Sequence, residues 1–103
     1  MQYSSIYITT GNEDEAKRIG RTLVEEKLAA CINILPIQSI YRWQGVIEEE
    51  GEAVMFVKTK AELADEVIAR VQELHSYDVP CIVALLIEKG SADYLKWVGE
   101  STR

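Results

Sequence analysis

The sequence predicts a single α+β domain in which four strands and two main helices follow the split βαβ order. Strand-like and helix-like periodicities alternate along the chain, and each of the two longest helical patterns lies between two strand patterns. The predicted order is strand, helix, strand, strand, helix, strand and a short last helix. This is the ferredoxin-like arrangement, with two helices on one face of a four-stranded antiparallel sheet. At 103 residues the chain is one domain, residues 1–103.

The first strand and helix are defined by a change of periodicity. Residues 3–10 are rich in β-branched and aromatic side chains, which is typical of a strand. Gly11 ends this pattern, and Asn12 with Glu15 predicts an N-cap and its capping-box partner. Apolar residues then recur at helical spacing, which predicts a helix to about Ala29.

The middle of the chain predicts a hairpin. Residues 31–43 have the pattern of a long strand, which we expect to break or bend at Pro36. Gly45 supplies the positive φ of a tight turn, and the return strand begins near Val46. The acidic run at residues 48–52 is interpreted as a solvated loop or bulge. The alternative is a patch that attracts cations, above all where several copies meet.

The second half repeats the helix and strand patterns. Thr59 and Glu62 predict a second capping box before an amphipathic helix. This helix ends at His75, the only histidine, where the helix dipole would stabilise a protonated imidazole. Residues 81–87 predict an apolar fourth strand, and Ser91 predicts the cap of a short last helix.

Charge and cysteine content limit the classes of partner and compartment. The net charge of −6 disfavours nucleic acid and anionic membranes as partners. No apolar run is long enough to span a bilayer, and no signal-peptide pattern is present. Cys31 and Cys81 each have apolar neighbours, which predicts two reduced, buried thiols, although their number also allows a disulfide. We therefore expect a cytoplasmic protein.

The apolar strands predict self-association. Residues 53–57 and 81–87 are apolar at almost every position, so both faces of these strands are apolar. Two main helices cannot cover both faces of the sheet. We therefore expect other copies of the chain to cover the remainder, and we expect the hairpin at Trp43 to reach a neighbouring chain.

Five short motifs are spread in order over nearly the whole chain. They are Leu28-Ala29-Ala30-Cys31, Ser39-Ile40-Tyr41-Arg42-Trp43-Gln44-Gly45, Lys58-Thr59, His75-Ser76-Tyr77-Asp78-Val79-Pro80 and Tyr94-Leu95-Lys96-Trp97. Together they resemble the CutA family of divalent-cation-tolerance proteins. The resemblance implies a ferredoxin-like protomer in a homotrimer, associated with tolerance to copper and other divalent metals. It also implies a likeness to the PII signalling proteins in fold and assembly.

The chain departs from the family pattern at positions that bear on metal binding. Some members carry a cysteine near the end of the first strand and a second histidine, both proposed as copper ligands; here those positions are Thr9 and Leu74. Members often have proline after the remaining histidine and glutamate after the later proline, where this chain has Ser76 and Cys81. The resemblance therefore implies that copper or another divalent cation binds only weakly.

His75 and Cys81 are the candidate metal ligands. Imidazole with further nitrogen or oxygen ligands suits Cu(II), and a thiolate suits Cu(I) or Zn(II). The two residues are six positions apart across a turn that contains Pro80. The alternative for His75 is a helix-end or interface histidine whose ring nitrogens are satisfied by hydrogen bonds.

A second group of residues suits either packing or a cleft. Aromatic side chains bury much area at interfaces, and they also form the walls of small-molecule pockets. The candidate cleft or interface residues are Cys31, Tyr41, Arg42, Trp43, Lys58, Tyr77 and Trp97. Further polar groups for such a pocket could come from the run at residues 48–50.

The sequence contains no pattern typical of an enzyme. No glycine-rich phosphate loop is present, and one histidine does not establish a Ser/His/Asp set. We therefore predict a non-enzymatic, homotrimeric protein that binds divalent metal ions, copper among them, and contributes to metal tolerance. The alternative is a PII-like signalling or scaffold module that binds a small effector or a partner protein at intersubunit clefts.

Overall fold

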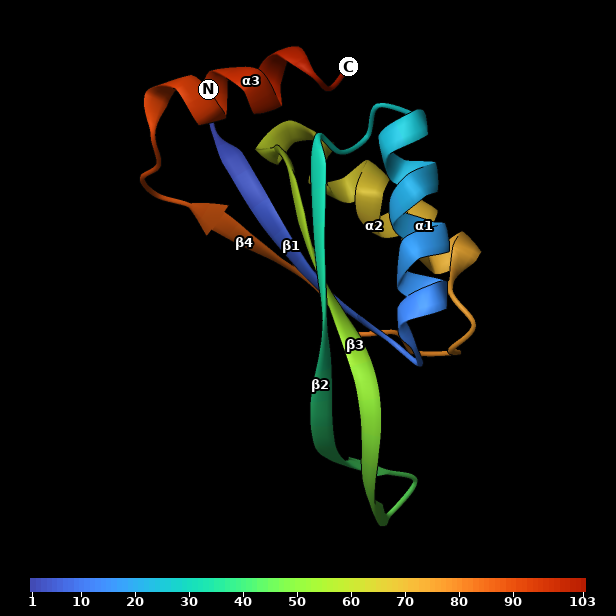
Figure 1. The fold of residues 1–103 in the computed structure, drawn as a ribbon. Coiled ribbons are helices and arrows are strands. Elements are labelled where there is room, and N and C mark those ends of the chain that lie inside the picture. Colours follow the sequence, from blue (N-terminus) through green and yellow to red (C-terminus); the bar gives the residue numbers. More distant parts are fainter.

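The computed structural model describes residues 1–103 and has the predicted ferredoxin-like architecture. The elements are β1 (Tyr3–Thr10), α1 (Glu13–Glu25), β2 (Cys31–Trp43), β3 (Val46–Lys60), a 3-10 turn (Ala61–Leu63), α2 (Ala64–Leu74), β4 (Ile82–Ile87) and α3 (Ala92–Glu100). The strands form one antiparallel sheet in the order β2-β3-β1-β4. Both α1 and α2 lie on one face of this sheet, and α3 lies across its end near the N-terminus (Figure 1).

The core lies between the sheet and helices α1 and α2. Successive side chains of a strand point to opposite faces, so every second residue of β1 and β3 faces the helices. On this face Ile6 and Ile8 of β1 and Met55 and Val57 of β3 are fully buried. Ile19 of α1 belongs to the same core cluster and is also fully buried. The apolar periodicity therefore positions β1, β3 and the two helices.

Helix α1 begins as the sequence predicts but ends earlier. The side chain of Asn12 accepts a hydrogen bond of 2.8 Å from the N–H of Glu15. In a full capping box the Glu15 side chain would accept the N–H of Asn12. Here the Glu15 carboxylate accepts the N–H of Gly11 instead. The helix ends at Glu25 and not near Ala29, since Lys27 has a left-handed φ of 59° that turns the chain.

The second predicted capping box is wrong. Thr59 remains in β3, where its buried hydroxyl donates a 2.6 Å hydrogen bond to the carbonyl of Leu28. The N-cap of the following 3-10 turn is Lys60, which makes no capping bond with its side chain. The Thr59 hydroxyl thus bonds a carbonyl that is distant in the sequence and does not cap the following helix.

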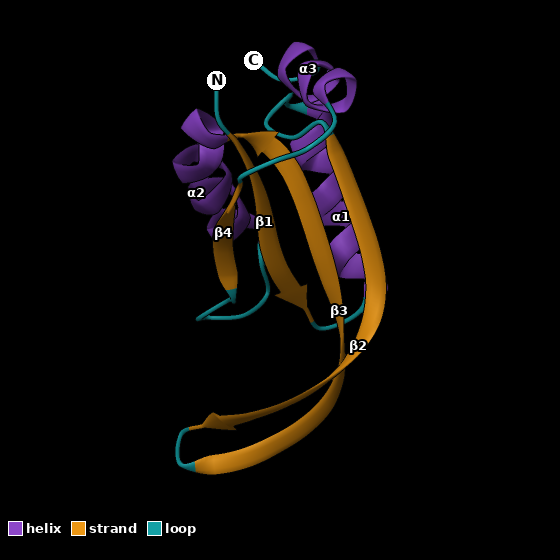
Figure 2. Cartoon of the chain, turned by 90° about the vertical axis from the view of Figure 1, so that its left-hand side faces the viewer, coloured by secondary structure: helices purple, strands orange, loops and turns teal.

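The hairpin of β2 and β3 is longer and more regular than predicted. Both strands are continuous: Pro36 pairs with Ala53, and residues 48–52 pair in register with β2. The expected break and the expected acidic loop are therefore wrong. Because β2 is an edge strand, proline is tolerated there without loss of pairing. Glu49 and Glu50 remain solvated because the far part of the hairpin projects from the body of the domain (Figure 2), whereas Glu52 at its inner end is buried.

The predicted turn at the tip of the hairpin is confirmed. Gln44 has a φ of 49° and Gly45 a φ of 83°, so both central residues are left-handed, as a two-residue type I′ turn requires. This turn connects Trp43 directly to Val46, which are partners in the register.

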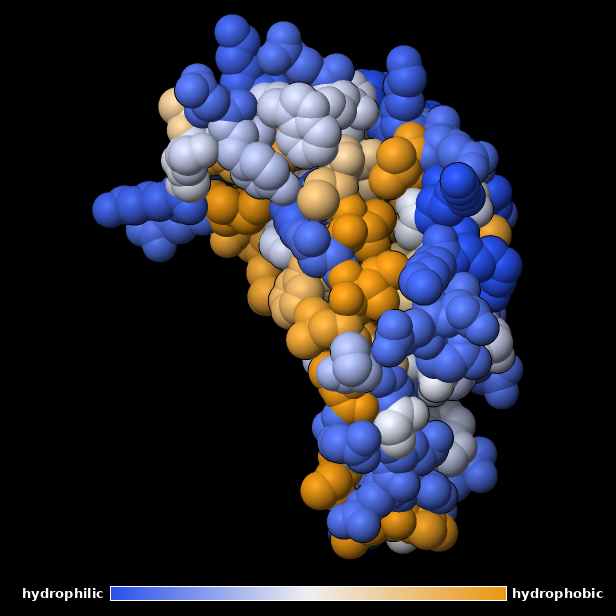
Figure 3. Space-filling view, in the orientation of Figure 1, coloured by the Kyte–Doolittle hydropathy of each residue, from blue (hydrophilic) through white to orange (hydrophobic).

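The face of the sheet opposite α1 and α2 is largely bare in the single chain. Leu35, Val83 and Leu85 are 44%, 48% and 50% exposed. Hydrophobic residues gather in the middle of the molecule in Figure 3, between α3 and the projecting hairpin. Since α3 covers only the end of the sheet (Figure 1), the strand pattern correctly indicated apolar residues that two helices leave uncovered.

Candidate functional site

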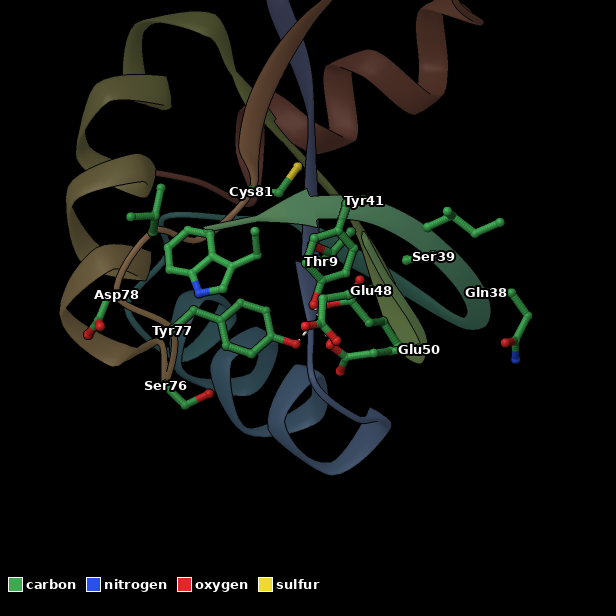
Figure 4. Close-up of a pocket in the computed structure, with 14 residues that line it drawn as sticks. Thr9, Gln38, Ser39, Tyr41, Glu48, Glu50, Ser76, Tyr77, Asp78 and Cys81 are labelled. Carbon is green, nitrogen blue, oxygen red and sulfur yellow. Dashed lines mark hydrogen bonds between the residues drawn. The ribbon is translucent and has the colours of Figure 1, made fainter. Parts of the chain in front are cut away.

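A pocket of about 890 Å³ lies where the hairpin leaves the sheet, against the loop between α2 and β4 (Figure 4). The hairpin contributes aromatic and acidic side chains, and the loop contributes residues of the motif that contains His75. The lining residues that matter for its chemistry are Tyr41, Trp43, Glu48, Glu50, Glu52, Tyr77, Asp78 and Cys81.

The acidic side chains reach the pocket because residues 48–52 form a strand. Alternation along β3 places Glu48, Glu50 and Glu52 on one face, and Glu48 pairs with Tyr41 across the hairpin. Glu49 belongs to the opposite face and does not line the pocket. With Asp78 from the loop, the lining has four acidic side chains and no lysine, arginine or histidine.

Two tyrosine hydroxyls hold two of these carboxylates. Tyr77 Oη donates to Glu52 Oε2 at 2.7 Å, and Tyr41 Oη donates to Glu50 Oε1. Burial and this hydrogen bond raise the pKa of Tyr77 well above its usual value. The hydrogen bond to Glu50 raises the pKa of Tyr41 to about 12. Both phenols therefore remain protonated donors at neutral pH.

His75 is buried at the C-terminal cap of α2, and both of its ring nitrogens have partners. Nδ1 accepts a 3.0 Å hydrogen bond from the N–H of Tyr77, and Nε2 lies 2.7 Å from the carbonyl oxygen of Thr9. Because a carbonyl only accepts, the partners assign the neutral tautomer with its proton on Nε2. His75 therefore has the geometry of a satisfied helix-end histidine, and coordination of a metal would require it to release one of these bonds.

Glu15 fastens the loop of the pocket to the start of α1. One carboxylate oxygen accepts the N–H of Ser76 at 2.8 Å, the other accepts the N–H of Gly11 at 3.2 Å, and His75 Nδ1 lies 3.9 Å away. Burial acts to raise the pKa of Glu15, but hydrogen bonds from Ser76 and Gly11 outweigh it, so the pKa is lowered. Sequence reasoning found Glu15 only as a capping residue, because Ser76 lies 61 positions away.

Of the two predicted metal ligands, only Cys81 lines the pocket. The N–H of Thr9 donates to the carbonyl of Cys81, while the carbonyl of Thr9 faces His75, so this strand residue connects the two. Cys81 is exposed, which contradicts its predicted burial, because it lies just before β4 at the edge of the pocket. No group of three or more histidine, cysteine, aspartate or glutamate side chains is arranged to hold a metal ion.

Three of the predicted cleft residues meet in the pocket, namely Tyr41, Trp43 and Tyr77. The four that lie elsewhere are Cys31, Arg42, Lys58 and Trp97. The half-buried Cys31 thiol lies 3.7 Å from the side-chain oxygen of Asn33, which also accepts a hydrogen bond from Lys58. Sequence reasoning included Glu52 only in a possible cation-attracting patch and assigned neither Glu52 nor Asp78 to the cleft; a period of two through the acidic run was the signal that would have placed Glu52 there.

The sequence is similar to that of known proteins over nearly its whole length. The family model described as CutA1 divalent ion tolerance protein matches residues 4–101. The divalent-cation tolerance protein CutA of Archaeoglobus fulgidus is 46% identical over 99 residues, which cover 96% of this chain and 97% of that protein. Its counterpart from Thermus thermophilus is 47% identical over 98 residues, covering 94% and 95% of the two chains.

Solved structures of CutA proteins have the same fold as this chain. The structure of the A. fulgidus protein, described as periplasmic, matches with a TM-score of 0.94 at 46% identity and covers 96% of this chain and 97% of that one. CutA1 from Oryza sativa matches with a TM-score of 0.96 at 38% identity, covering 100% and 95%. A rice relative named as chloroplastic is longer, and the match spans 56% of it. No helix of this chain is both long and apolar enough to cross a membrane. The chain belongs to the CutA1 family of divalent ion tolerance proteins.

Proposed function

We propose that this chain binds divalent metal ions weakly, copper among them, and contributes to divalent-cation tolerance as a non-enzymatic homotrimer. The observation that carries the proposal is the pocket, in which four acidic side chains and the Cys81 thiol meet without a basic residue. Such a lining raises the local concentration of cations. Membership of the divalent ion tolerance family supports the same direction. A cytoplasmic location stays a prediction.

The donor atoms of the pocket support weak binding over tight binding. Carboxylates suit hard cations and a thiolate suits Cu(I) or Zn(II), but no three such groups are arranged around one point. The Cys81 thiolate is the main ligand, because Cys81 already lines the pocket. His75 joins only when Nδ1 gives up the N–H of Tyr77, so its contribution is smaller than that of Cys81.

We expect Cys81→Ser to weaken the binding of Zn(II), because the thiolate is the softest donor in the pocket. Isothermal titration of metal-free protein with Zn(II) and Cu(II) measures this. Cys31→Ser is the matched control, since Cys31 is the other free cysteine and lies outside the pocket. Absence of saturable binding in the wild type, or equal losses in the two serine variants, would contradict the proposal.

The trimer in this proposal is supported by the bare sheet face and by the projecting hairpin. Trp43 is 44% exposed at the end of β2, where a neighbouring chain would bury it. We expect Trp43→Ala to shift the protein towards monomer on dilution, because large aromatic side chains dominate interface energies. Size-exclusion chromatography with light scattering measures the mass. A wild type that is monomeric when dilute, or a variant with unchanged assembly, would refute this expectation.

A second candidate function is the binding of a small effector. The pocket volume of about 890 Å³ lies within the range of small-molecule sites, and aromatic side chains line it. This candidate predicts that a ligand binds without metal and without direct contact with His75, which does not line the pocket.

A further inference from the structure

The charges of the pocket restrict what it can hold. Its lining has four acidic side chains and no basic one, and none of the four takes part in an ion pair elsewhere in the protein. An anionic ligand would meet only like charges here. A ligand that neutralises this lining therefore carries positive charge.

Glu52 makes the need for a cation specific. Glu52 is only 9% exposed. The sole hydrogen bond to its carboxylate comes from the uncharged hydroxyl of Tyr77. This carboxylate therefore has no cationic partner in the protein, and a cation bound in the pocket would neutralise it. Glu52 thus places a negative charge at the inner end of the acidic face of the hairpin, and Glu50 and Glu48 lie farther toward its tip.

The aromatic lining distinguishes an organic cation from a bare metal ion. Trp43, Tyr41 and Tyr77 all line the pocket, and the two phenol groups already donate to Glu50 and Glu52. Figure 4 shows the Tyr41 and Tyr77 rings beside the carboxylate-bearing strand. What the two tyrosines still offer to a ligand is the ring surface that faces the pocket, since the His75 ring packs against the Tyr77 ring with 4.8 Å between centroids. Aromatic rings attract ammonium groups and bury their methyl or methylene groups. A cavity of about 890 Å³ is also far larger than an ion needs.

We propose that this pocket is a binding site for an organic ammonium compound, held between the rings of Tyr41 and Tyr77 and the carboxylates of Glu50 and Glu52. This inference rests on the second candidate function, for which it names the chemical class of the ligand. The cation takes the place of a counter-ion for Glu52, and the aromatic side chains select alkylated nitrogen over hydrated inorganic ions.

Choline and 3,3-dimethyl-1-butanol test the role of charge directly, because the second molecule replaces the ammonium nitrogen by carbon and keeps the shape. Each is titrated into metal-free wild-type protein in phosphate buffer with a chelator, which excludes amine buffers and metals. We expect saturable choline binding that is at least about tenfold tighter than that of the neutral isostere. No saturable binding of choline, or equal binding of both, overturns the proposal.

Glu50→Gln and Glu49→Gln test the location. Both remove one negative charge from the same hairpin, but only Glu50 lines the pocket, and a glutamine there can still accept the hydrogen bond of Tyr41. We expect Glu50→Gln to weaken choline binding by at least about threefold and Glu49→Gln by less than about twofold. Equal effects of the two variants would assign the binding to general surface charge and overturn the proposal.

The outcomes also distinguish the ammonium site from the metal-binding proposal and from the effector candidate. If the neutral isostere binds as tightly as choline, the pocket takes small molecules without regard to charge, so the ammonium inference fails and the effector candidate stands. If choline binds but Zn(II) and Cu(II) do not, the metal-binding proposal fails and the ammonium site stands.

Discussion

Ile6→Ala is expected to lower the free energy of unfolding by about 2–5 kcal/mol. Ile6 is fully buried in the middle of β1, where it pairs with Val57 on one side and Ala84 on the other. The substitution leaves a cavity between the sheet and the two helices, and the strands on both sides prevent the core from collapsing into it.

Unfolding in guanidinium chloride at one fixed protein concentration measures this loss, since self-association would otherwise change the midpoint. Val24→Ala on the exposed side of α1 is the control, and we expect it to change stability by no more than about 0.5 kcal/mol. Similar losses for the two variants would show that Ile6 does not occupy the core position that the structure assigns to it.

Glu15→Gln is expected to cost about 1–3 kcal/mol at neutral pH. The carboxylate accepts two backbone N–H groups, from Gly11 and Ser76, which belong to different parts of the chain. A glutamine has only one oxygen, so one of these N–H groups would face its amide donor. We therefore also expect the loop that forms one wall of the pocket to become more mobile.

The same carboxylate predicts the direction of the acid dependence. The pKa of Glu15 in the folded chain is lowered from 4.5, so its contribution to stability is present above about pH 4.5. That contribution is lost as the pH falls through the lower pKa of the folded state. Unfolding midpoints between about pH 3 and pH 7 should therefore fall less steeply for Glu15→Gln than for the wild type.

Glu13→Gln is the control for this experiment, because Glu13 is an exposed acidic residue in the first turn of the same helix. We expect it to lose no more than about 1 kcal/mol through the helix dipole and to keep the acid dependence of the wild type. An unchanged pH profile for Glu15→Gln would refute the role of Glu15 as the anchor of the loop.

Much of the fold was predictable because short-range interactions define it. Asn12 caps α1 through a donor three residues away, and Ser91 caps α3 through the N–H of Tyr94 in the same way. The hairpin turn depends on Gly45 and its neighbour alone. The five motifs in their order were also enough to identify the family, which the match over residues 4–101 confirmed.

The predictions that failed concern residues whose partners are distant in the sequence. Thr59 was assigned to a helix cap, but the carbonyl of Leu28 takes its hydroxyl across 31 positions. The acidic run was interpreted as a loop because glutamates are unfavourable in an isolated strand. Pairing with β2 along the whole hairpin outweighs that preference, and Glu49 and Glu50 stay exposed to water.

The candidate site shows the same division between local and long-range information. The sequence by itself determined the fold class and the family, and it indicated Cys81, Tyr41, Trp43 and Tyr77 as candidate site residues. Only the tertiary structure decided that Thr9, 66 positions away, occupies one nitrogen of His75, and that Cys81 lines the pocket while His75 does not. The physical reason is that helix and turn signals act over a few residues, whereas the partners of a side chain depend on how the sheet brings distant strands together.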